Sequence, residues 1–502
     1  TVNHDEGYCF QIFGGSEQGM IGKSIGLSNE EEKTFNTATK KYTFNKKYYQ
    51  YTAAYSTNVN LRGTGEAETD TDQPAGLAET EYIYGGGNEG DVCGNSIVIL
   101  GKGRIYDSFG GACDANILGH AETYIGRSGV DASGNDIPSF PWIRDNVYGA
   151  NDFGGKILGE KDFKERLRAT DIYNMVHGEE NDGTKDVLKA NAYVEYLQGH
   201  VGVDIFGGNY GDYDYSDPEY KPTSDVPDIV SAFVHIRPQD NNKNAVVGKI
   251  FGGGEGHSGY REGDNMQDRS YVLVNIPQGI TNFSGTEVFG AGSNNGLGMD
   301  FEPVETFNDN FDPDRLSAIV DLMHGEIANV YGGSYNEGVT ARSVVNVPYG
   351  SDIKLSNIFG GAYGTKTLPP CDVFESNVNY YSEDARVSNI YGGNNQERRT
   401  LYANVNIYSP VWSNYEKGYL AKVFGAGLGE RTWSEYTEVN LYGKTDNQEG
   451  DYTGARVYEV YGGGQEGHVL CAESVQKYMS EFFTAQGCTS LTDPTWSDAW
   501  TL

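Results

Sequence analysis

A four-residue glycine motif recurs along the whole chain and constrains its fold more than any other feature. The motif reads Ile/Val-Tyr/Phe-Gly-Gly/Ala, as in Ile12–Gly15, Ile205–Gly208 and Ile390–Gly393. A motif that returns this often is typical of repeat proteins, in which each repeat packs on its neighbours. The first glycines of its copies are Gly14, Gly85, Gly110, Gly149, Gly207, Gly252, Gly290, Gly332, Gly360, Gly392, Gly425 and Gly462.

A second recurrent feature lies between the motifs, a stretch in which polar and apolar residues alternate. Examples are Ser56–Leu61, Arg342–Val347 and Ala403–Tyr408. Alternation with period two, together with β-branched residues, indicates a β-strand. Each repeat is therefore expected to contain a motif strand, a loop, an alternating strand and a second loop.

The spacing of the motifs favours one architecture over another. Consecutive motifs lie 25 to 58 residues apart, except for a first interval of 71. A propeller blade needs four strands at a regular period of about 40 to 50 residues, whereas the shortest intervals have room for one coil of a solenoid. The sequence therefore predicts an all-β fold, a right-handed parallel β-helix (β-solenoid) with variable loop insertions.

The repeats also predict the organisation of the chain. A globular chain of 502 residues would be expected to form about three domains, but repeats along almost its whole length favour one body. We expect an N-terminal cap and first coil in residues 1–80 and solenoid repeats in 81–470, with an excursion at 156–199. An amphipathic pattern predicts a C-terminal capping helix and tail in residues 471–502.

The motif itself suggests a candidate binding surface. Side chains alternate between the two faces of a strand, so the β-branched residue should point inward and the aromatic residue outward, and stacked repeats would form an aromatic column for a glycan or protein partner. Alternatively, the corner turns these rings into the core or under a loop. Paired glycines would permit positive φ angles and close approach of neighbouring coils. The candidate tyrosines are Tyr84, Tyr148, Tyr331, Tyr391 and Tyr461.

Acidic residues dominate the charge of the chain. The net charge is -34, which argues against binding to nucleic acid. Acids such as Asp152 and Glu255 follow most of the glycine corners and are expected to be solvated. Two further groups of carboxylates suit calcium, although neither has the EF-hand spacing and both could be ordinary solvated loops. These candidate metal ligands are Asp212, Asp214 and Asp217 in one group and Asp309, Asp312 and Asp314 in the other.

Cysteine usage leaves two alternatives open. Six cysteines occur without a Cys-x-x-Cys pair, which argues against a zinc or redox site. Cys93 and Cys113 follow successive motifs, so they either join adjacent coils by a disulfide or are free thiols. No apolar run is long enough for a transmembrane helix.

The motifs resemble those of known surface proteins. FGGA occurs at Phe109–Ala112 and Phe359–Ala362, and resembles the glycine-rich β-helices of bacterial adhesins, autotransporter passengers and polymorphic outer-membrane proteins. The companion Phe-x-x-Asn repeat of the last family is represented only by Phe374–Asn377. The Tyr/Phe-Gly-Gly-Gly pattern is similar to solenoid proteins of gut-type Bacteroidetes. The resemblance implies an extracellular or cell-surface location, associated with the outer membrane.

Three classes of function are compatible with these observations. We expect a non-catalytic binding or adhesion protein whose partner is a glycan, matrix or protein, because no catalytic constellation is recognisable. One alternative is a structural subunit of an outer-membrane or filament assembly. The other is a polysaccharide lyase or glycoside hydrolase, since β-helices can carry paired acids.

Overall fold

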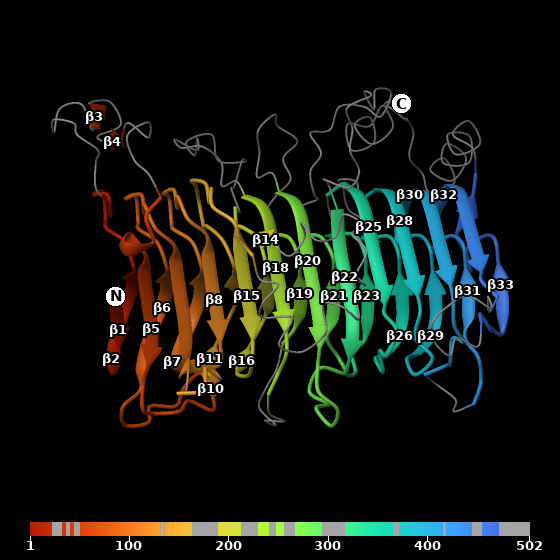
Figure 1. Cartoon of the computed structure of the whole chain (residues 1–502), viewed down its shortest axis with the longest axis horizontal. Helices are drawn as coiled ribbons and strands as arrows, with labels where there is room; N and C mark the ends of the chain where they lie inside the picture. Colours follow the sequence, from red (N-terminus) through yellow and green to blue (C-terminus); the bar gives the residue numbers. More distant parts are fainter. Residues whose placement is uncertain are drawn as a thin grey trace, which may run out of the picture. The chain divides into compact units, whose positions relative to one another are not determined.

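A computed structural model gives the architecture of most of the chain. Within the residues it describes, the protein is nearly all β: 28 strands form parallel pairs, and the only helical element is a 3-10 turn, η2 (Ala53–Tyr55) (Figure 1). The described residues are 1–22, 33–36, 41–44, 51–130, 132–134, 136–162, 189–211, 229–239, 247–255, 267–293, 317–336, 338–364, 371–414, 418–443 and 454–470.

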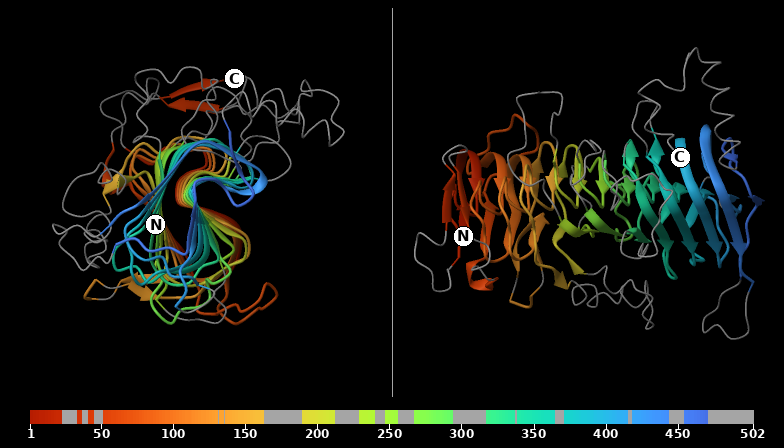
Figure 2. Two further views of the ribbon diagram at one scale, coloured as in Figure 1. Left: turned by 90° about the vertical axis from the view of Figure 1, so that its right-hand side faces the viewer. Right: turned by 90° about the horizontal axis from the view of Figure 1, so that it is seen from above.

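The chain divides into two compact units. Unit 1 comprises Thr1–Glu165, Asp186–Gly248 and Gly254–Gly256, and unit 2 comprises Arg166–Lys185, Lys249–Gly253 and His257–Leu502. Each unit contains the same two sets of parallel strands. We call the strands that end at the glycine motifs the motif ladder, and the strands between the motifs the alternating ladder. Within a unit, the strands of one ladder follow one another in chain order (Figure 2).

In unit 1, the long strand β7 (Ser96–Phe109) takes part in both ladders. The other motif-ladder strands are β2 (Gly7–Phe13), β6 (Ala78–Tyr84), β12 (Val147–Tyr148) and β17 (Asp204–Phe206). In addition, β11 (Pro141–Ile143) pairs with β7, and β16 (His200–Val201) pairs with β11. The other alternating-ladder strands are β1 (Val2–His4), β5 (Thr57–Arg62), β8 (Ala121–Ile125), β15 (Ala192–Tyr196) and β18 (Ile229–Ile236).

Unit 2 repeats the arrangement. Its motif-ladder strands are β19 (Lys249–Phe251), β21 (Glu287–Phe289), β23 (Asn329–Tyr331), β26 (Lys354–Phe359), β29 (Arg386–Tyr391), β31 (Lys422–Phe424) and β33 (Glu459–Tyr461). Its alternating-ladder strands are β20 (Gln267–Asn275), β22 (Ser317–His324), β25 (Thr340–Val347), β28 (Val373–Tyr380), β30 (Asn395–Ile407) and β32 (Leu428–Leu441), together with the short β24 (Tyr335–Asn336), β27 (Tyr363–Gly364) and β34 (His468–Val469).

Among the described residues, three antiparallel pairs of strands stand apart from the parallel ladders, all in unit 1. They are β3 (Lys33–Asn36) with β4 (Lys41–Phe44), β9 (Arg127–Val130) with β10 (Asp136–Pro138), and β13 (Lys161–Asp162) with β14 (Lys189–Ala190).

Equivalent residues of successive repeats lie directly opposite one another. In unit 2, Val330 pairs with Ile358 and Ile358 pairs with Ile390, and all three side chains are fully buried. Asparagines precede them, and Asn357 Nδ2 donates to Asn329 Oδ1 over 3.0 Å. The prediction that the β-branched residue faces the core is therefore confirmed.

Close approach of neighbouring corners explains the first glycine of most motifs, although nothing lies within 4 Å of a Cβ at Gly462 in the last copy. A Cβ on Gly360 would lie 2.5 Å from the carbonyl oxygen of Gly392, its equivalent in the next repeat, and 3.0 Å from Ser376 Oγ. The motif glycines do not have positive φ angles, so of the two properties that paired glycines permit, the corners use close approach. Glycine is needed because no room exists for a side chain.

A hydroxyl group from the alternating ladder completes six of the corners. Ser376 Oγ donates to the Gly392 carbonyl oxygen over 2.5 Å, and the acceptor is buried between the two ladders. This bond satisfies a carbonyl group that has no access to water. The same contact recurs as Thr57 to Gly85, Ser96 to Gly110, Ser270 to Gly290, Ser343 to Gly360 and Thr437 to Gly462, at 2.5 to 2.6 Å.

Several predicted features lie outside the described residues. These are the C-terminal capping helix in 471–502, the central part (163–188) of the excursion at 156–199, and Cys471 and Cys488. Cys93 and Cys113 are free thiols, so the second of the two cysteine alternatives holds for this pair.

Candidate functional site

The motif aromatic residues form a column in each unit, as the sequence predicts. In unit 1, Tyr84 stacks on Phe109 at 4.9 Å between ring centroids, and Phe109 stacks on Tyr148 at 5.0 Å. In unit 2, Tyr331 stacks on Phe359 at 5.0 Å and Phe359 on Tyr391 at 4.8 Å. The interplanar angles of these pairs are 4 to 7°, so the rings pack face to face.

These rings are not a solvent-exposed surface. Tyr84, Tyr148, Tyr331 and Tyr391 are only 1 to 2% exposed, and Tyr461 alone reaches 42%. The expectation that the column faces outward is therefore wrong for the first four tyrosines, and the alternative that places them under another segment holds. A ligand-binding role for these tyrosines is untested, and burial leaves only Tyr461 accessible among them.

The segment that follows each glycine corner covers the column. In unit 1, the Tyr210 ring packs edge-on against Tyr148, with centroids 5.2 Å apart. In unit 2, Tyr335 packs edge-on against Phe289 at 5.3 Å, and Tyr363 against Tyr331 at 5.6 Å. The strand alternation itself is kept, and the rings are buried because the chain folds back over them.

Each buried tyrosine hydroxyl of the column has a polar partner from a later repeat. Tyr84 Oη donates to Asp152 Oδ2 over 2.9 Å, and Tyr148 Oη donates to Glu255 Oε2 over 2.5 Å. In unit 2, Asn395 Nδ2 donates to Tyr331 Oη over 3.2 Å, and Tyr391 Oη donates to Gln465 Oε1 over 2.6 Å. Each of these partners is the third residue after the first glycine of the motif two copies further along the chain. Tyr331 Oη also donates to Glu287 Oε1 of an earlier repeat over 3.4 Å.

The sequence contains a signal for this pairing, which appears when each motif is compared with the motif two copies further along the chain. Where the motif has Tyr, the third residue after the first glycine two motifs on is Asp, Glu, Asn or Gln. Where the motif has Phe, the ring has no hydroxyl group, so the residue at that later position does not need to accept a hydrogen bond. The corresponding residues for the phenylalanine motifs are Cys113, Tyr210, Ser293, Tyr335, Tyr363 and Leu428.

Burial changes the acid–base properties of these corners. Asp152 is almost fully buried, so the expectation of a solvated acid is wrong at this position. Burial raises its pKa to about 8, although the hydrogen bond from Tyr84 acts in the opposite direction. Burial also raises the pKa of the nearby Asp107 to about 6. These carboxyl groups therefore titrate near neutral pH.

A buried polar network lies on the alternating ladder of unit 1. Glu122 accepts hydrogen bonds from Tyr124 Oη and, over 2.8 Å, from Lys161 Nζ, and its Oε1 lies 2.8 Å from His120 Nε2. Burial raises the pKa of Glu122, but the contacts with His120 and Lys161 outweigh burial and hold the pKa at about 2. A carboxylate with this pKa stays ionised and is unsuited to donate a proton near neutral pH.

The network continues on the two following strands of this ladder. Glu195 is fully buried, and its Oε1 accepts from Arg237 Nε over 2.5 Å and from Tyr193 Oη over 3.1 Å. Arg237 also pairs with Asp136 of β10 over 2.5 Å. The charges are thus matched within the network, which ties the β9–β10 hairpin to the ladder.

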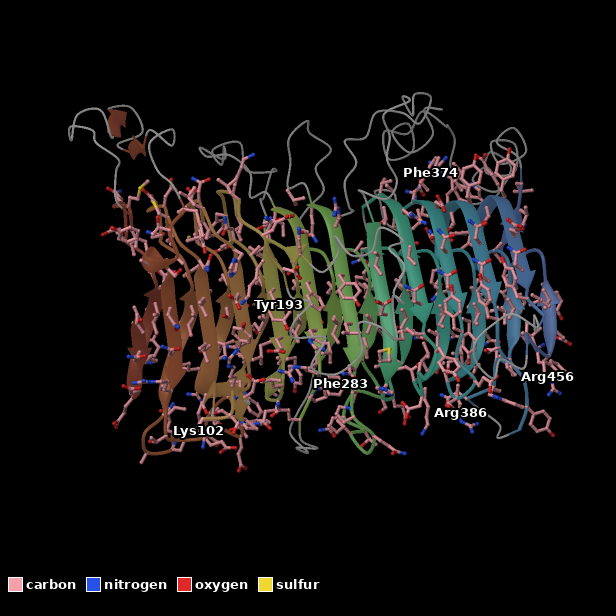
Figure 3. All side chains as sticks on the ribbon, in the orientation of Figure 1. Lys102, Tyr193, Phe283, Phe374, Arg386 and Arg456 are labelled. Carbon is pink, nitrogen blue, oxygen red and sulfur yellow. The ribbon has the colours of Figure 1, made fainter. Side chains whose placement is uncertain are left out.

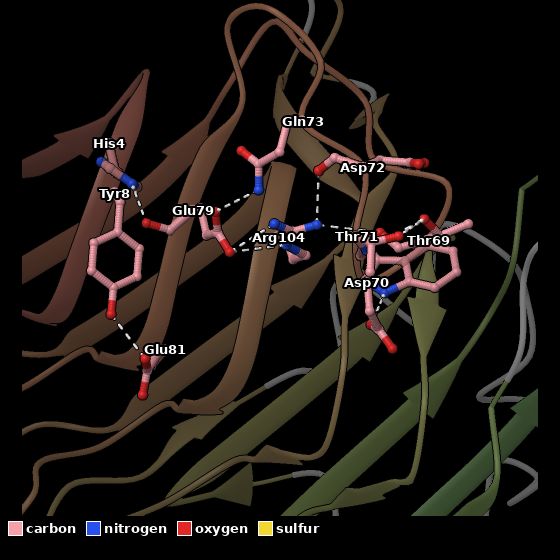
Figure 4. Close-up of polar contacts among 11 residues, drawn as sticks. His4, Tyr8, Thr69, Asp70, Thr71, Asp72, Gln73, Glu79, Glu81 and Arg104 are labelled. Carbon is pink, nitrogen blue, oxygen red and sulfur yellow. Dashed lines mark hydrogen bonds and ion pairs between the residues drawn. The ribbon is translucent and has the colours of Figure 1, made fainter.

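A second matched cluster lies near the beginning of the chain (Figure 4). Arg104, which is 2% exposed, donates to Glu79 Oε1 over 2.7 Å and to the Asp72 carbonyl oxygen over 2.8 Å. Trp142 Nε1 donates to Asp70 Oδ1 over 2.8 Å. These contacts hold the loop before β6 against β7, so we assign this arginine a structural role.

The accessible candidate site is the outer face of β28, β30 and β32, which lie side by side in Figure 1. Residues of one parity form four rows, of which three lie within the strands and the fourth consists of the residue that follows each strand. We call this array the Tyr/Asn face. Its rows are Glu375, Tyr402 and Tyr436; Asn377, Asn404 and Glu438; Asn379, Asn406 and Asn440; and Tyr381, Tyr408 and Tyr442.

Amide side chains connect the strands along the third row. Asn406 Nδ2 donates to Asn379 Oδ1 over 3.0 Å, and Asn440 Nδ2 donates to Asn406 Oδ1 over 3.1 Å. The row extends to β25, where Asn346 Oδ1 accepts from Asn379 over 3.0 Å. This chain of hydrogen bonds fixes the orientation of the amides at the spacing of the strands.

Two rows of aromatic rings border the amides. Tyr402 stacks on Tyr436 at 4.9 Å, and Tyr408 stacks on Tyr442 at 4.2 Å. Unlike the motif column, these rings reach solvent: Tyr402 is 38% exposed, Tyr436 59% and Tyr442 40%. Phe374, labelled in Figure 3, lies beside Tyr402 with centroids 5.5 Å apart.

The glycine motif does not predict this face, because the residues of the face lie on the strands between the motifs. The available signal was a tyrosine at a constant offset from the polar alternation, in Asn377–Tyr381, Asn404–Tyr408 and Glu438–Tyr442. In each, the residues at positions one, three and five share one face of the strand.

The predicted calcium ligands Asp212, Asp214, Asp217, Asp309, Asp312 and Asp314 lie outside the described residues, so calcium binding stays a prediction. Among the residues described, no group of three or more His, Cys, Asp or Glu side chains is placed to hold a metal ion. That same part of the chain contains no helix that is long and apolar enough to cross a membrane.

Comparison with known proteins provides no family assignment for this chain. No protein-family model, no curated protein and no solved structure matches it.

Proposed function

We propose that this protein is a non-catalytic binding protein of the cell surface or extracellular space, and that its Tyr/Asn face binds a glycan. The observation that carries this proposal is the accessible array of tyrosine hydroxyls and asparagine amides on three adjacent strands. Exposed aromatic side chains that occur in groups mark interaction surfaces, and amides and hydroxyls can both donate and accept hydrogen bonds to sugar hydroxyls.

The proposed scaffold is a right-handed parallel β-helix, or β-solenoid. Each repeat contributes one strand to the motif ladder and one to the alternating ladder, and the pairing partners are the same strands of the neighbouring repeats. A repeat scaffold of this kind presents equivalent residues at regular intervals. The resemblance of the motifs to bacterial surface proteins and the net charge of -34 support an exported location.

The matched charges of the other polar clusters favour binding over catalysis. The most buried network, around Glu122 and Glu195, has its carboxylates engaged by Arg237, Lys161 and tyrosine hydroxyls. A glycoside hydrolase requires a carboxylic acid that is protonated at working pH and that reaches the substrate. The pKa of Glu122 is about 2, and Asp152, whose pKa is raised to about 8, is buried against Tyr84.

Retention on immobilised polysaccharides tests the proposal. The wild-type protein is compared with the double variant Tyr402→Ala, Tyr436→Ala and with the control Tyr419→Ala, since Tyr419 is 60% exposed and lies outside the array. We expect at least one polysaccharide to retain the wild type and the control but not the double variant. Equal retention of all three proteins, or no retention of the wild type, would contradict the proposal.

A further inference from the structure

We propose that the Tyr/Asn face binds an uncharged polysaccharide chain laid across the strands, which it recognises by hydrogen bonds rather than by stacking on aromatic faces. This inference rests on the glycan-binding function proposed above. It specifies the class of glycan, the direction in which it lies and the groups that contact it.

The direction follows from what repeats on the face. Along a strand the outward side chains change from tyrosine to asparagine and back to tyrosine, as in Tyr402, Asn404, Asn406 and Tyr408. Across the strands the side chain stays the same in the third and fourth rows, as in Asn379, Asn406 and Asn440, and in the first and second rows a glutamate replaces it on one strand. Adjacent strands are about 4.8 Å apart. A polymer of identical units meets identical partners only if it runs across the strands.

The amides of the third row retain hydrogen-bonding capacity. An asparagine side chain has two N–H donors and a carbonyl oxygen with two lone pairs. Asn406 uses one N–H toward Asn379 and accepts from Asn440 Nδ2. Each member of the row therefore has a second N–H, and these donors recur once per strand for the hydroxyl groups of a sugar chain.

The charge of the face selects against acidic glycans. Its residues are tyrosines, asparagines and the two acids Glu375 and Glu438, and Arg342 of the neighbouring β25 is paired with Glu375 at 3.8 Å. The chain as a whole carries a net charge of -34. A polymer of uronic acids or sulfated sugars would meet like charge, which opposes its approach. An uncharged glycan meets no such barrier.

The stacking of the rings determines how the tyrosines contact a ligand. Tyr402 and Tyr436 are nearly parallel, with an interplanar angle of 8°, and Tyr408 and Tyr442 are at 2°. Each ring therefore has at least one face covered by its neighbour, which leaves ring edges and hydroxyl groups to contact a ligand, with Tyr442 Oη also donating to Asn406 Oδ1 over 3.4 Å. A sugar that crosses a row contacts the hydroxyls and not a ring face.

Removing hydroxyl groups separates the two modes of contact. Loss of one hydrogen bond weakens binding by about 2- to 10-fold, so Tyr402→Phe and Tyr408→Phe should each lower the affinity for an oligosaccharide by this factor. If the sugar stacked on ring faces, both variants would bind as the wild type does. Tyr419→Phe is the matched control outside the face, and thermal unfolding of each variant verifies that the fold is intact.

Calorimetric titration with two series of oligosaccharides, one uncharged and one of uronic acids, completes the test. We expect only the uncharged series to bind, with an affinity that rises with length until the chain spans the face. Binding of the acidic series, affinity independent of length, or wild-type affinity in both Phe variants would overturn this inference while the glycan-binding function stands. If neither series nor any immobilised polysaccharide binds, the proposed function itself fails.

Discussion

At the scale of single residues, the buried tyrosine hydroxyls of the motif column depend on polar side chains for their hydrogen bonds. Tyr84 donates to Asp152 over 2.9 Å at a buried site, whereas Tyr8 donates to Glu81 over 2.8 Å at an exposed one. We expect Tyr84→Phe to lower the free energy of unfolding by about 1 to 3 kcal/mol, because a buried acceptor loses its donor. Urea denaturation of the purified protein measures this change.

Tyr8→Phe is the matched control for this prediction. It removes the same kind of hydrogen bond, but water replaces the donor at an exposed carboxylate, so a change of no more than about 0.5 kcal/mol is expected. Equal effects of the two substitutions would show that the buried pairing contributes nothing beyond its exposed counterpart.

The raised pKa of Asp152 predicts a dependence of stability on pH. Its pKa is about 8 in the folded chain, against an ordinary value of 3.8 for an aspartate, so between these values the folded state binds more protons than the unfolded state. The stabilisation is complete below pH 4 and is lost as the pH rises through 8. One such proton contributes a slope of at most about 1.4 kcal/mol per pH unit.

Asp152→Asn isolates this contribution, since an amide oxygen can still accept the Tyr84 hydroxyl but does not titrate. Urea midpoints at pH 5 and pH 8 should differ less in the variant than in the wild type. Asp107, whose pKa is raised to about 6, acts in the same direction and remains in both proteins. An identical pH dependence of the two proteins would refute the assignment to Asp152.

At the scale of the elements, the glycine corner sets the distance between adjacent repeats. A Cβ on Gly360 would meet the Gly392 carbonyl oxygen at 2.5 Å, and this oxygen is fixed by the hydroxyl of Ser376. Gly360→Ala should therefore destabilise unit 2 by about 1 to 3 kcal/mol or more, as overpacking does in cores. Thermal unfolding followed by circular dichroism measures the loss.

Gly285→Ala provides the comparison, because nothing lies within 4 Å of a Cβ at that position and its φ angle is not positive. We expect its unfolding temperature to stay close to that of the wild type. If both alanine variants unfold alike, close approach is not the reason for the motif glycine.

The elements also show what the sequence can and cannot predict. Strand parity near Val330 and Ile358 follows from local alternation, and the parallel register then follows from the repeat. The cover over Tyr331 does not, because it is formed by Tyr363 and Asn395, which belong to later repeats. Loop insertions of different length separate these residues along the chain. Their constant position, the third residue after the first glycine, is therefore seen only after the motifs are aligned. The Tyr/Asn face was within reach, since its tyrosines keep a constant offset within their strands.

At the scale of the whole molecule, the net charge of -34 opposes folding through self-repulsion. Added salt shortens the screening length from about 30 Å at 0.01 M to about 8 Å at 0.15 M. We therefore expect sodium chloride to raise the thermal unfolding temperature. Exposed ion pairs such as Arg62 with Asp5 are weakened by the same salt, but each contributes no more than about 1 kcal/mol. A fall in unfolding temperature with salt would contradict this balance.

A comparison of calcium with magnesium separates stabilisation by charge screening from stabilisation by specific ion binding. The sequence predicts calcium sites at two groups of three aspartates, which are Asp212, Asp214 and Asp217, and Asp309, Asp312 and Asp314. Calcium prefers several oxygen ligands and tolerates irregular geometry, whereas magnesium requires a near-ideal octahedron. At equal ionic strength, calcium chloride should therefore raise the unfolding temperature more than magnesium chloride. Asn substitutions at Asp212, Asp214 and Asp217 should reduce that difference. Equal effects of the two salts would leave the acidic loops as contributors to net charge alone.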